Sequence, residues 1–202
     1  ILYELAQVNY DSSDFNVAHK HILDAIELHE PYAYSILHAQ ILIELGEKKE
    51  ALTVLTDKRD TSTDASKIYQ KANLLMLLEK YTLAAAAYDT LNSIDSNYAG
   101  NIEVAKAMEA AGYYKRARHY LKQECEKVYH AERAELALFL HDLKFQPGKT
   151  ALKSYNDYRK KGFHRDPFAI YRLRLFLKHP FLAWRFHDLA GLIVLQILFL
   201  AI

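Results

Sequence analysis

The chain has 202 residues, of which 51% are hydrophobic, and its formal net charge is +1. A chain of this length and composition can bury a core, and its single cysteine, Cys125, excludes an internal disulfide framework. The charge is divided unevenly, because residues 1–100 carry 8 Lys/Arg against 15 Asp/Glu, whereas residues 101–202 carry 18 against 10.

Taken in chain order, apolar residues recur at helical spacing, short polar or glycine-containing turns separate the runs, and no strand-like alternation occurs. Gly46 and Gly112 stand where a helix end favours a left-handed residue, and Pro167 suits the first position of a helix. The sequence therefore predicts an all-α chain. The expected helices cover residues 1–11, 14–28, 32–45, 48–58, 65–79, 82–94, 98–111, 114–128, 131–144, 149–161 and 167–179.

Alanines recur at a fixed period through these helices: Ala18, Ala51, Ala84, Ala117 and Ala151 are 33, 33, 33 and 34 residues apart. Four residues after each stands a large apolar side chain, at Ile22, Leu55, Tyr88, Leu121 and Tyr155. Twelve residues before the first four stands another alanine, at Ala6, Ala39, Ala72 and Ala105, whereas Phe139 takes this place before Ala151. Positions i and i+4 share a helix face, so each pair forms a stripe that packs on a neighbouring helix. A period of this length predicts a right-handed α–α superhelix of about five helix pairs.

The pattern resembles the tetratricopeptide repeat (TPR) family, a helix–turn–helix unit, over roughly residues 1–164. The best-matching repeat is Tyr32 to Ala65, and the next two lie near residues 66–97 and 98–131. The early Trp of the family pattern is absent, Pro closes a unit only at Pro31, and the last unit is degenerate, as a terminal repeat is expected to be.

This resemblance implies a concave groove, lined by the first helix of each pair, in which family members bind peptide segments. Carried over by position, the groove receives Gln40, Glu44, Tyr69, Gln70, Asn73, Glu103 and Lys106. Family members that clamp a C-terminal carboxylate use Asn and Lys/Arg residues spread over three repeats. Here only Asn73 and Lys106 match such a set, so the resemblance does not predict binding of chaperone tails.

The sequence beyond residue 164 changes in character. We expect residues 165–188 to form a basic capping or juxtamembrane segment, with the row Ile170, Leu173 and Leu177 covering the end of the repeats. Residues 189–202 contain one polar residue, Gln196, and we interpret them as the start of a transmembrane helix in a chain cut from a longer protein. The alternative is a helix buried against the repeats or in a dimer.

A cluster of basic residues precedes this apolar run, at Arg159, Lys160, Lys161, Arg165, Arg172, Arg174, Lys178 and Arg185. Basic residues beside a membrane span resist translocation, so we expect the repeats on the cytoplasmic side of a membrane. Binding of nucleic acid by this cluster is the less favoured interpretation, and we expect none.

The histidine and carboxylate residues of this sequence are not spaced as a catalytic or metal site requires. His19 and His21 point about 200° apart on a helix, and Pro31 directly after His29-Glu30 rules out a zinc-protease helix. The adjacent residues His141 and Asp142 do not face each other on a helix. We therefore expect no catalytic residue, no metal and no cofactor.

The predicted function is a non-catalytic protein–protein interaction scaffold, binding a peptide or protein segment in its groove, on the cytoplasmic side of a membrane protein. The first alternative is a regulatory domain of a multi-span membrane enzyme, such as an intramembrane protease, or of a transporter, with the active site beyond residue 202. The second alternative is a soluble adaptor, in which the terminal apolar helix is buried.

Overall fold

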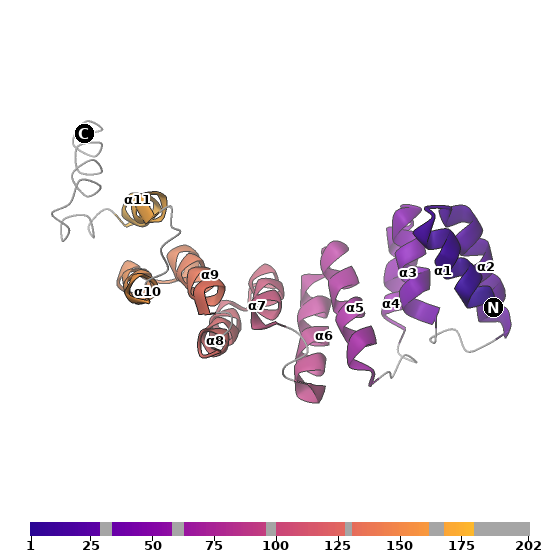
Figure 1. Ribbon diagram of the computed structural model, residues 1–202, viewed down its shortest axis with the longest axis horizontal. Coiled ribbons are helices and arrows are strands. Elements are labelled where there is room, and N and C mark those ends of the chain that lie inside the picture. Colours follow the sequence, from indigo (N-terminus) through magenta and orange to yellow (C-terminus); the bar gives the residue numbers. More distant parts are fainter. Residues whose placement is uncertain (29–33, 58–62, 96–99, 128–130, 162–167, 180–202) are drawn as a thin grey trace. The chain divides into compact units, whose positions relative to one another are not determined.

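The computed structural model describes residues 1–28, 34–57, 63–95, 100–127, 131–161 and 168–179. Over these ranges the chain consists of helices joined by turns, with no strand (Figure 1). The helices are α1 (Leu2–Asp11), α2 (Phe15–Leu28), α3 (Ser35–Glu44), α4 (Lys48–Leu55), α5 (Ala65–Leu77), α6 (Tyr81–Ile94), α7 (Asn101–Ala110), α8 (Tyr114–Cys125), α9 (Ala131–Phe145), α10 (Gly148–Lys160) and α11 (Phe168–Lys178). The all-α prediction and the pairing of helices are confirmed.

The chain divides into two compact units, Ile1–Gly100 and Asn101–Ile202, which are called unit 1 and unit 2 below. The predicted domain boundaries at residues 164/165 and 188/189 fall outside the described residues, as does the whole apolar segment 189–202. These assignments stay predictions. No described helix combines the length and the apolarity needed to cross a membrane.

The turns inside the first four pairs share one backbone conformation. Ser13, Gly46, Glu79 and Gly112, each 33 residues after the last, have φ between 59° and 84°. In each turn the backbone N–H of the next residue donates a hydrogen bond to a carbonyl oxygen of the preceding helix. In the second pair, the N–H of Glu47 donates to the carbonyl oxygen of Leu42 at 2.8 Å. This left-handed residue closes the helix end, and glycine adopts it without strain. The sequence predicted it at the two glycines; the other two turns use the same geometry without one.

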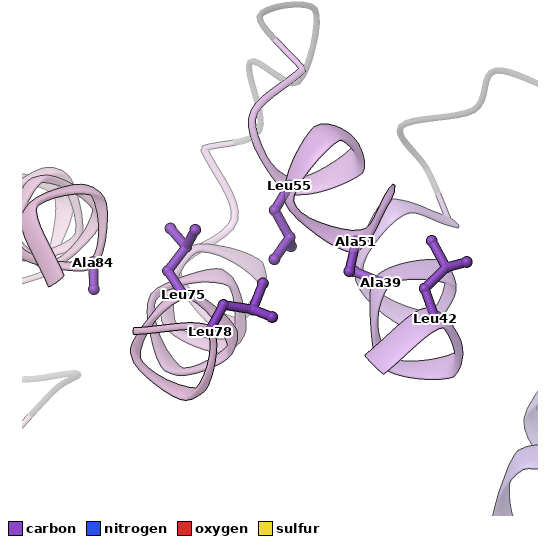
Figure 2. Packing of buried hydrophobic residues seen from close by; sticks show 7 residues of the cluster. All are labelled: Ala39, Leu42, Ala51, Leu55, Leu75, Leu78 and Ala84. Carbon is purple, nitrogen blue, oxygen red and sulfur yellow. The ribbon is translucent and has the colours of Figure 1, made fainter. Parts of the chain in front are cut away.

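Unit 1 is built on the repeating alanines. Ala6, Ala18 and Ile22 pack with Leu37 and Ile41, so that α1 and α2 contact α3. A second cluster joins α3, α4, α5 and α6, and Figure 2 shows its seven residues. They are Ala39, Leu42, Ala51, Leu55, Leu75, Leu78 and Ala84.

Figure 2 shows why a small residue recurs in the second cluster. Leu55 of α4 points toward Leu75 of α5 and toward Leu78, the residue directly after this helix, and fills the space between α4 and α5. Ala39 of α3 and Ala51 of α4 lie where their helices meet, and both are fully buried. A larger side chain at either alanine would push the helices apart, because protein interiors have little free volume. The periodic alanine is therefore a packing requirement.

Unit 2 departs from this rule at its last complete pair. Phe139 occupies the small-residue place on α9 and is fully buried, with its ring 5.3 Å from that of Tyr155 on α10. Leu175 and Phe176 of α11 complete this cluster and are also fully buried. The phenylalanine fits because α11 adds a further apolar layer around it.

The predicted face of α11 is confirmed in part, because Leu173 packs against the cluster around Phe139 whereas Leu177 does not. Leu177, expected to cover the repeats, is 56% exposed, whereas Leu175 and Phe176 are buried. Leu173 is half-buried, and the side chain of Ile170 lies outside the described residues. Both faces of α11 are apolar, so its sequence pattern alone does not decide which one turns inward.

Candidate functional site

The predicted groove residues of unit 1 lie on two neighbouring helices. Gln40 is half-buried and Glu44 is exposed on α3, which contacts α5, the helix that carries Tyr69, Gln70 and Asn73. The structure therefore brings the helices of these five predicted residues together.

Three of these side chains already have interactions within unit 1. Asn73 Oδ1 accepts a hydrogen bond of 2.6 Å from the hydroxyl of Tyr88, the large residue four positions after Ala84. The rings of Tyr69 and Tyr88 meet edge to face at 6.2 Å, and Gln70 Nε2 donates to Ser66 Oγ at 3.2 Å. Asn73 and Tyr69 thus help to seat Tyr88 between α5 and α6, which reduces what they can offer a partner.

The predicted groove residues of unit 2, Glu103 and Lys106, lie on α7. Glu103 Oε1 is 3.9 Å from Arg133 Nη2 of α9. Lys106 is exposed and lines a pocket of about 220 Å³ between α7, α8 and α9. The lining residues are Ile102, Ala105, Lys106, Glu109, Leu121, Ala137, Leu140, His141 and Lys144. Most of this lining is aliphatic, and the rest is charged or polar.

The polar part of this pocket, called the α7–α9 pocket below, contains one close pair. His141 Nδ1 of α9 lies 2.5 Å from Glu109 Oε1 of α7, with the histidine side chain fully buried and the glutamate 26% exposed. His141 Nε2 has no hydrogen-bond partner among the described residues. This pair ties the two walls of the pocket together.

A second polar cluster fixes α9 from its other side. Asp142 is fully buried, and its carboxylate accepts hydrogen bonds from Arg118 Nε at 2.6 Å and Arg118 Nη2 at 2.9 Å. Ser154 Oγ of α10 donates to the same carboxylate at 2.5 Å. The bond to Asp142 raises the pKa of the Arg118 guanidinium. His141 and Asp142 thus bond to different helices, as expected for adjacent helical residues.

The surroundings of Cys125 and of His38 shift the pKa values of both side chains. Burial, followed by the nearby Glu135 carboxylate, raises the pKa of the Cys125 thiol to about 12, so the thiol is protonated at neutral pH. The His19 and His38 rings stack at 5.5 Å, and burial lowers the pKa of His38 to about 4. Within the described ranges, no three His, Cys, Asp or Glu residues are placed to hold a metal ion.

Sequence reasoning missed Leu140 and Lys144, although a signal existed. Counted from the small-residue place, Leu140 and Lys144 follow Phe139 by one and five residues, just as Gln40 and Glu44 follow Ala39. Applying the same repeat positions to the degenerate fifth helix pair would have identified Leu140 and Lys144 as groove residues. Glu109 and His141 could not be found in this way, because their pairing depends on how α7 packs against α9.

Comparison with known proteins identifies the fold. A tetratricopeptide repeat protein from Parabacteroides merdae superposes with a TM-score of 0.66 at 16% identity, covering 98% of this chain and 77% of that one. MamA from Desulfovibrio magneticus RS-1 gives a TM-score of 0.61 at 13% identity, covering 82% and 95%. No protein-family model and none of the curated proteins matches the sequence. The structural likeness confirms a TPR-like helical-repeat fold.

Proposed function

We propose that this chain, which has a TPR-like helical-repeat fold, is a non-catalytic protein-interaction scaffold that binds a peptide segment on the first helices of its pairs. The observation that carries the proposal is the α7–α9 pocket, because α7 and α9 are the first helices of consecutive pairs. Its aliphatic lining supplies the apolar contact that a binding site needs. No hydroxyl or thiol side chain lines it, so the pocket itself offers no such nucleophile.

Polar interactions between the helices that form the pocket support this role. The Glu109–His141 pair joins α7 to α9, and the Asp142–Arg118 pair joins α9 to α8. A pocket already formed costs less ordering on binding than a loop that must close around its ligand. We therefore expect a partner to bind without rearranging unit 2.

The test is a selection from a random peptide-display library on the full chain, followed by affinity measurements on the enriched peptides. Ala137→Phe should abolish their binding, because it fills the cavity from its α9 wall. Ala86→Phe, at an exposed site on α6, is the matched control and should leave binding unchanged. Circular dichroism melting of both variants separates a filled pocket from a lost fold.

Two outcomes oppose the proposal. The first is a selection that enriches no peptide. The second is a set of peptides that binds folded Ala137→Phe as tightly as the parent chain, since the α7–α9 pocket would then have no part in binding.

We also propose that residues 189–202 attach the chain to a membrane, with the repeats on its cytoplasmic side. The support is in the sequence alone: an apolar run of 14 residues preceded by basic residues. Fractionation of cells that express the whole protein, with protease added to intact cells or spheroplasts, tests it. Recovery in the soluble fraction favours the adaptor alternative, and digestion of the repeats from outside contradicts the cytoplasmic placement.

Catalytic residues in membrane spans encoded after residue 202 would favour the first alternative named above, a regulatory domain of a membrane enzyme or transporter. The α7–α9 pocket would then bind a segment of the same protein or of its substrate.

A further inference from the structure

The charged side chains that line the α7–α9 pocket differ in how accessible they are to a ligand. Lys106 and Lys144 are exposed and stand on its two sides, on α7 and α9. The one acidic lining residue, Glu109, already has its carboxylate against His141. The ammonium groups of the two lysines are therefore the charges that an incoming ligand meets first.

Further interactions strengthen this positive side. Lys178 Nζ of α11 donates a hydrogen bond of 2.7 Å to the carbonyl of Lys144, which brings a third cation to the end of α9. Lys144 Nζ lies 4.7 Å from the centroid of the Phe145 ring, and the Lys144 side chain is exposed. The neighbouring acid on α7, Glu103, faces Arg133. Residues 101–202 as a whole carry an excess of basic residues, 18 against 10 acidic.

We propose that the α7–α9 pocket binds an internal peptide segment in which one large apolar side chain is flanked by glutamate or aspartate residues. The inference rests on the proposed function and names the class of partner. The apolar side chain enters the aliphatic cavity of about 220 Å³, and the flanking carboxylates meet Lys106 and Lys144. Burial of the side chain provides most of the affinity, and the carboxylates fix orientation and exclude basic peptides.

An internal segment suits this pocket better than a chain terminus. A terminal carboxylate needs several donors that converge on one point, and the lining offers no amide side chain for this. Asn73, the asparagine predicted for such a set, lies in unit 1 and accepts the hydrogen bond from Tyr88. Lys106 on α7 and Lys144 on α9 each offer one ammonium group, which suits side-chain carboxylates on an internal segment.

The probe is a fluorescent peptide with one phenylalanine between two pairs of glutamates, blocked at both ends. We expect saturable binding to the full chain, measured by fluorescence anisotropy, that weakens as salt is raised. Replacing its phenylalanine by serine should weaken binding by about tenfold or more. Replacing the glutamates by lysines should abolish measurable binding. A peptide with a free C-terminus and neutral flanks that bound more tightly would overturn the internal-segment assignment.

Variants of the chain locate the site. Lys106→Glu and Lys144→Glu should each weaken binding of the acidic peptide by about fivefold, since an exposed charge pair contributes modestly. Lys153→Glu, at an exposed site on α10 outside the pocket, makes the same change in net charge and should have a smaller effect. Equal effects of all three variants would mean non-specific attraction to a basic surface and would overturn the proposal.

The peptides from the display selection distinguish this inference from the proposed function. Basic or neutral peptides that bind the parent chain but not folded Ala137→Phe would refute the acidic partner class and leave the scaffold function standing. Failure of every peptide at the pocket would refute both.

Discussion

Both units of this chain pack helices in pairs, but the residues buried between the helices differ. Among the described residues of unit 1, Ser35 is the one buried polar side chain. Among the described residues of unit 2, six polar side chains are buried: Asn101, Glu124, Glu135, His141, Asp142 and Ser154. Unit 1 keeps the small alanine in every pair, whereas unit 2 replaces it at Phe139 and adds α11. Apolar packing dominates the contacts between the helices of unit 1, beside the hydrogen bond from Tyr88 to Asn73, whereas buried polar contacts also join the helices of unit 2.

The largest expected effect is on the Asp142 cluster. Asp142→Ala leaves Arg118 and Ser154 without the buried carboxylate that accepts from both, so we expect a loss of about 3 kcal/mol or more in the free energy of unfolding. Urea unfolding of the full chain, followed by circular dichroism, measures it. Glu132→Ala, at an exposed site on the same helix, is the control. If both variants were equally stable, buried polar contacts would not be what distinguishes unit 2.

The second effect tests the apolar rule of unit 1. Ala84 is fully buried in α6, so Ala84→Leu should overpack the cluster in Figure 2 and cost about 1–3 kcal/mol. Ala86→Leu adds the same side chain at an exposed site of this helix and should be nearly neutral. Thermal unfolding compares the two. Identical melting temperatures for Ala84→Leu and the parent chain would mean that the assigned repeat register is wrong.

The third effect concerns the turn conformation that the first four pairs share. Glu79 has φ of 59°, in the region that favours glycine, and its side chain is exposed. Glu79→Gly should therefore stabilise the chain by about 0.5–1 kcal/mol, since it relieves left-handed strain. Glu47→Gly, one residue after the glycine of the preceding turn, lacks this compensation and should not stabilise. A lower melting temperature for Glu79→Gly would show that the carboxylate is needed there.

The fourth effect is a pH dependence that arises at His38 of unit 1. Burial and the neighbouring His19 lower the pKa of His38 from its ordinary 6.5 to about 4. Between these values the unfolded chain binds more protons at this site than the folded one, so stability falls as pH drops from 6.5 toward 4. His38→Gln should flatten this part of the pH profile of the unfolding free energy. His119→Gln, at an exposed site on α8, should not.

The sequence by itself determined the helices, their pairing and the repeat. Two helices that cross closely need a small residue at the crossing. The repeated alanines therefore predicted how the helices of unit 1 pack. The groove residues Glu103 and Lys106 came from the resemblance to the TPR family, carried over by position, and they stay predictions; Lys106 lies in the lining of the α7–α9 pocket.

Tertiary structure alone decided the rest. The sequence pattern did not decide which face of α11 turns inward. It also did not show that Asp142 bonds to Arg118, 24 residues away, or that His141 bonds to Glu109, 32 residues away. No local pattern records such pairs, because a buried carboxylate and an exposed one are the same letter in the sequence. The pocket exists because three helices meet there, and its chemistry depends on which of their charges are already paired.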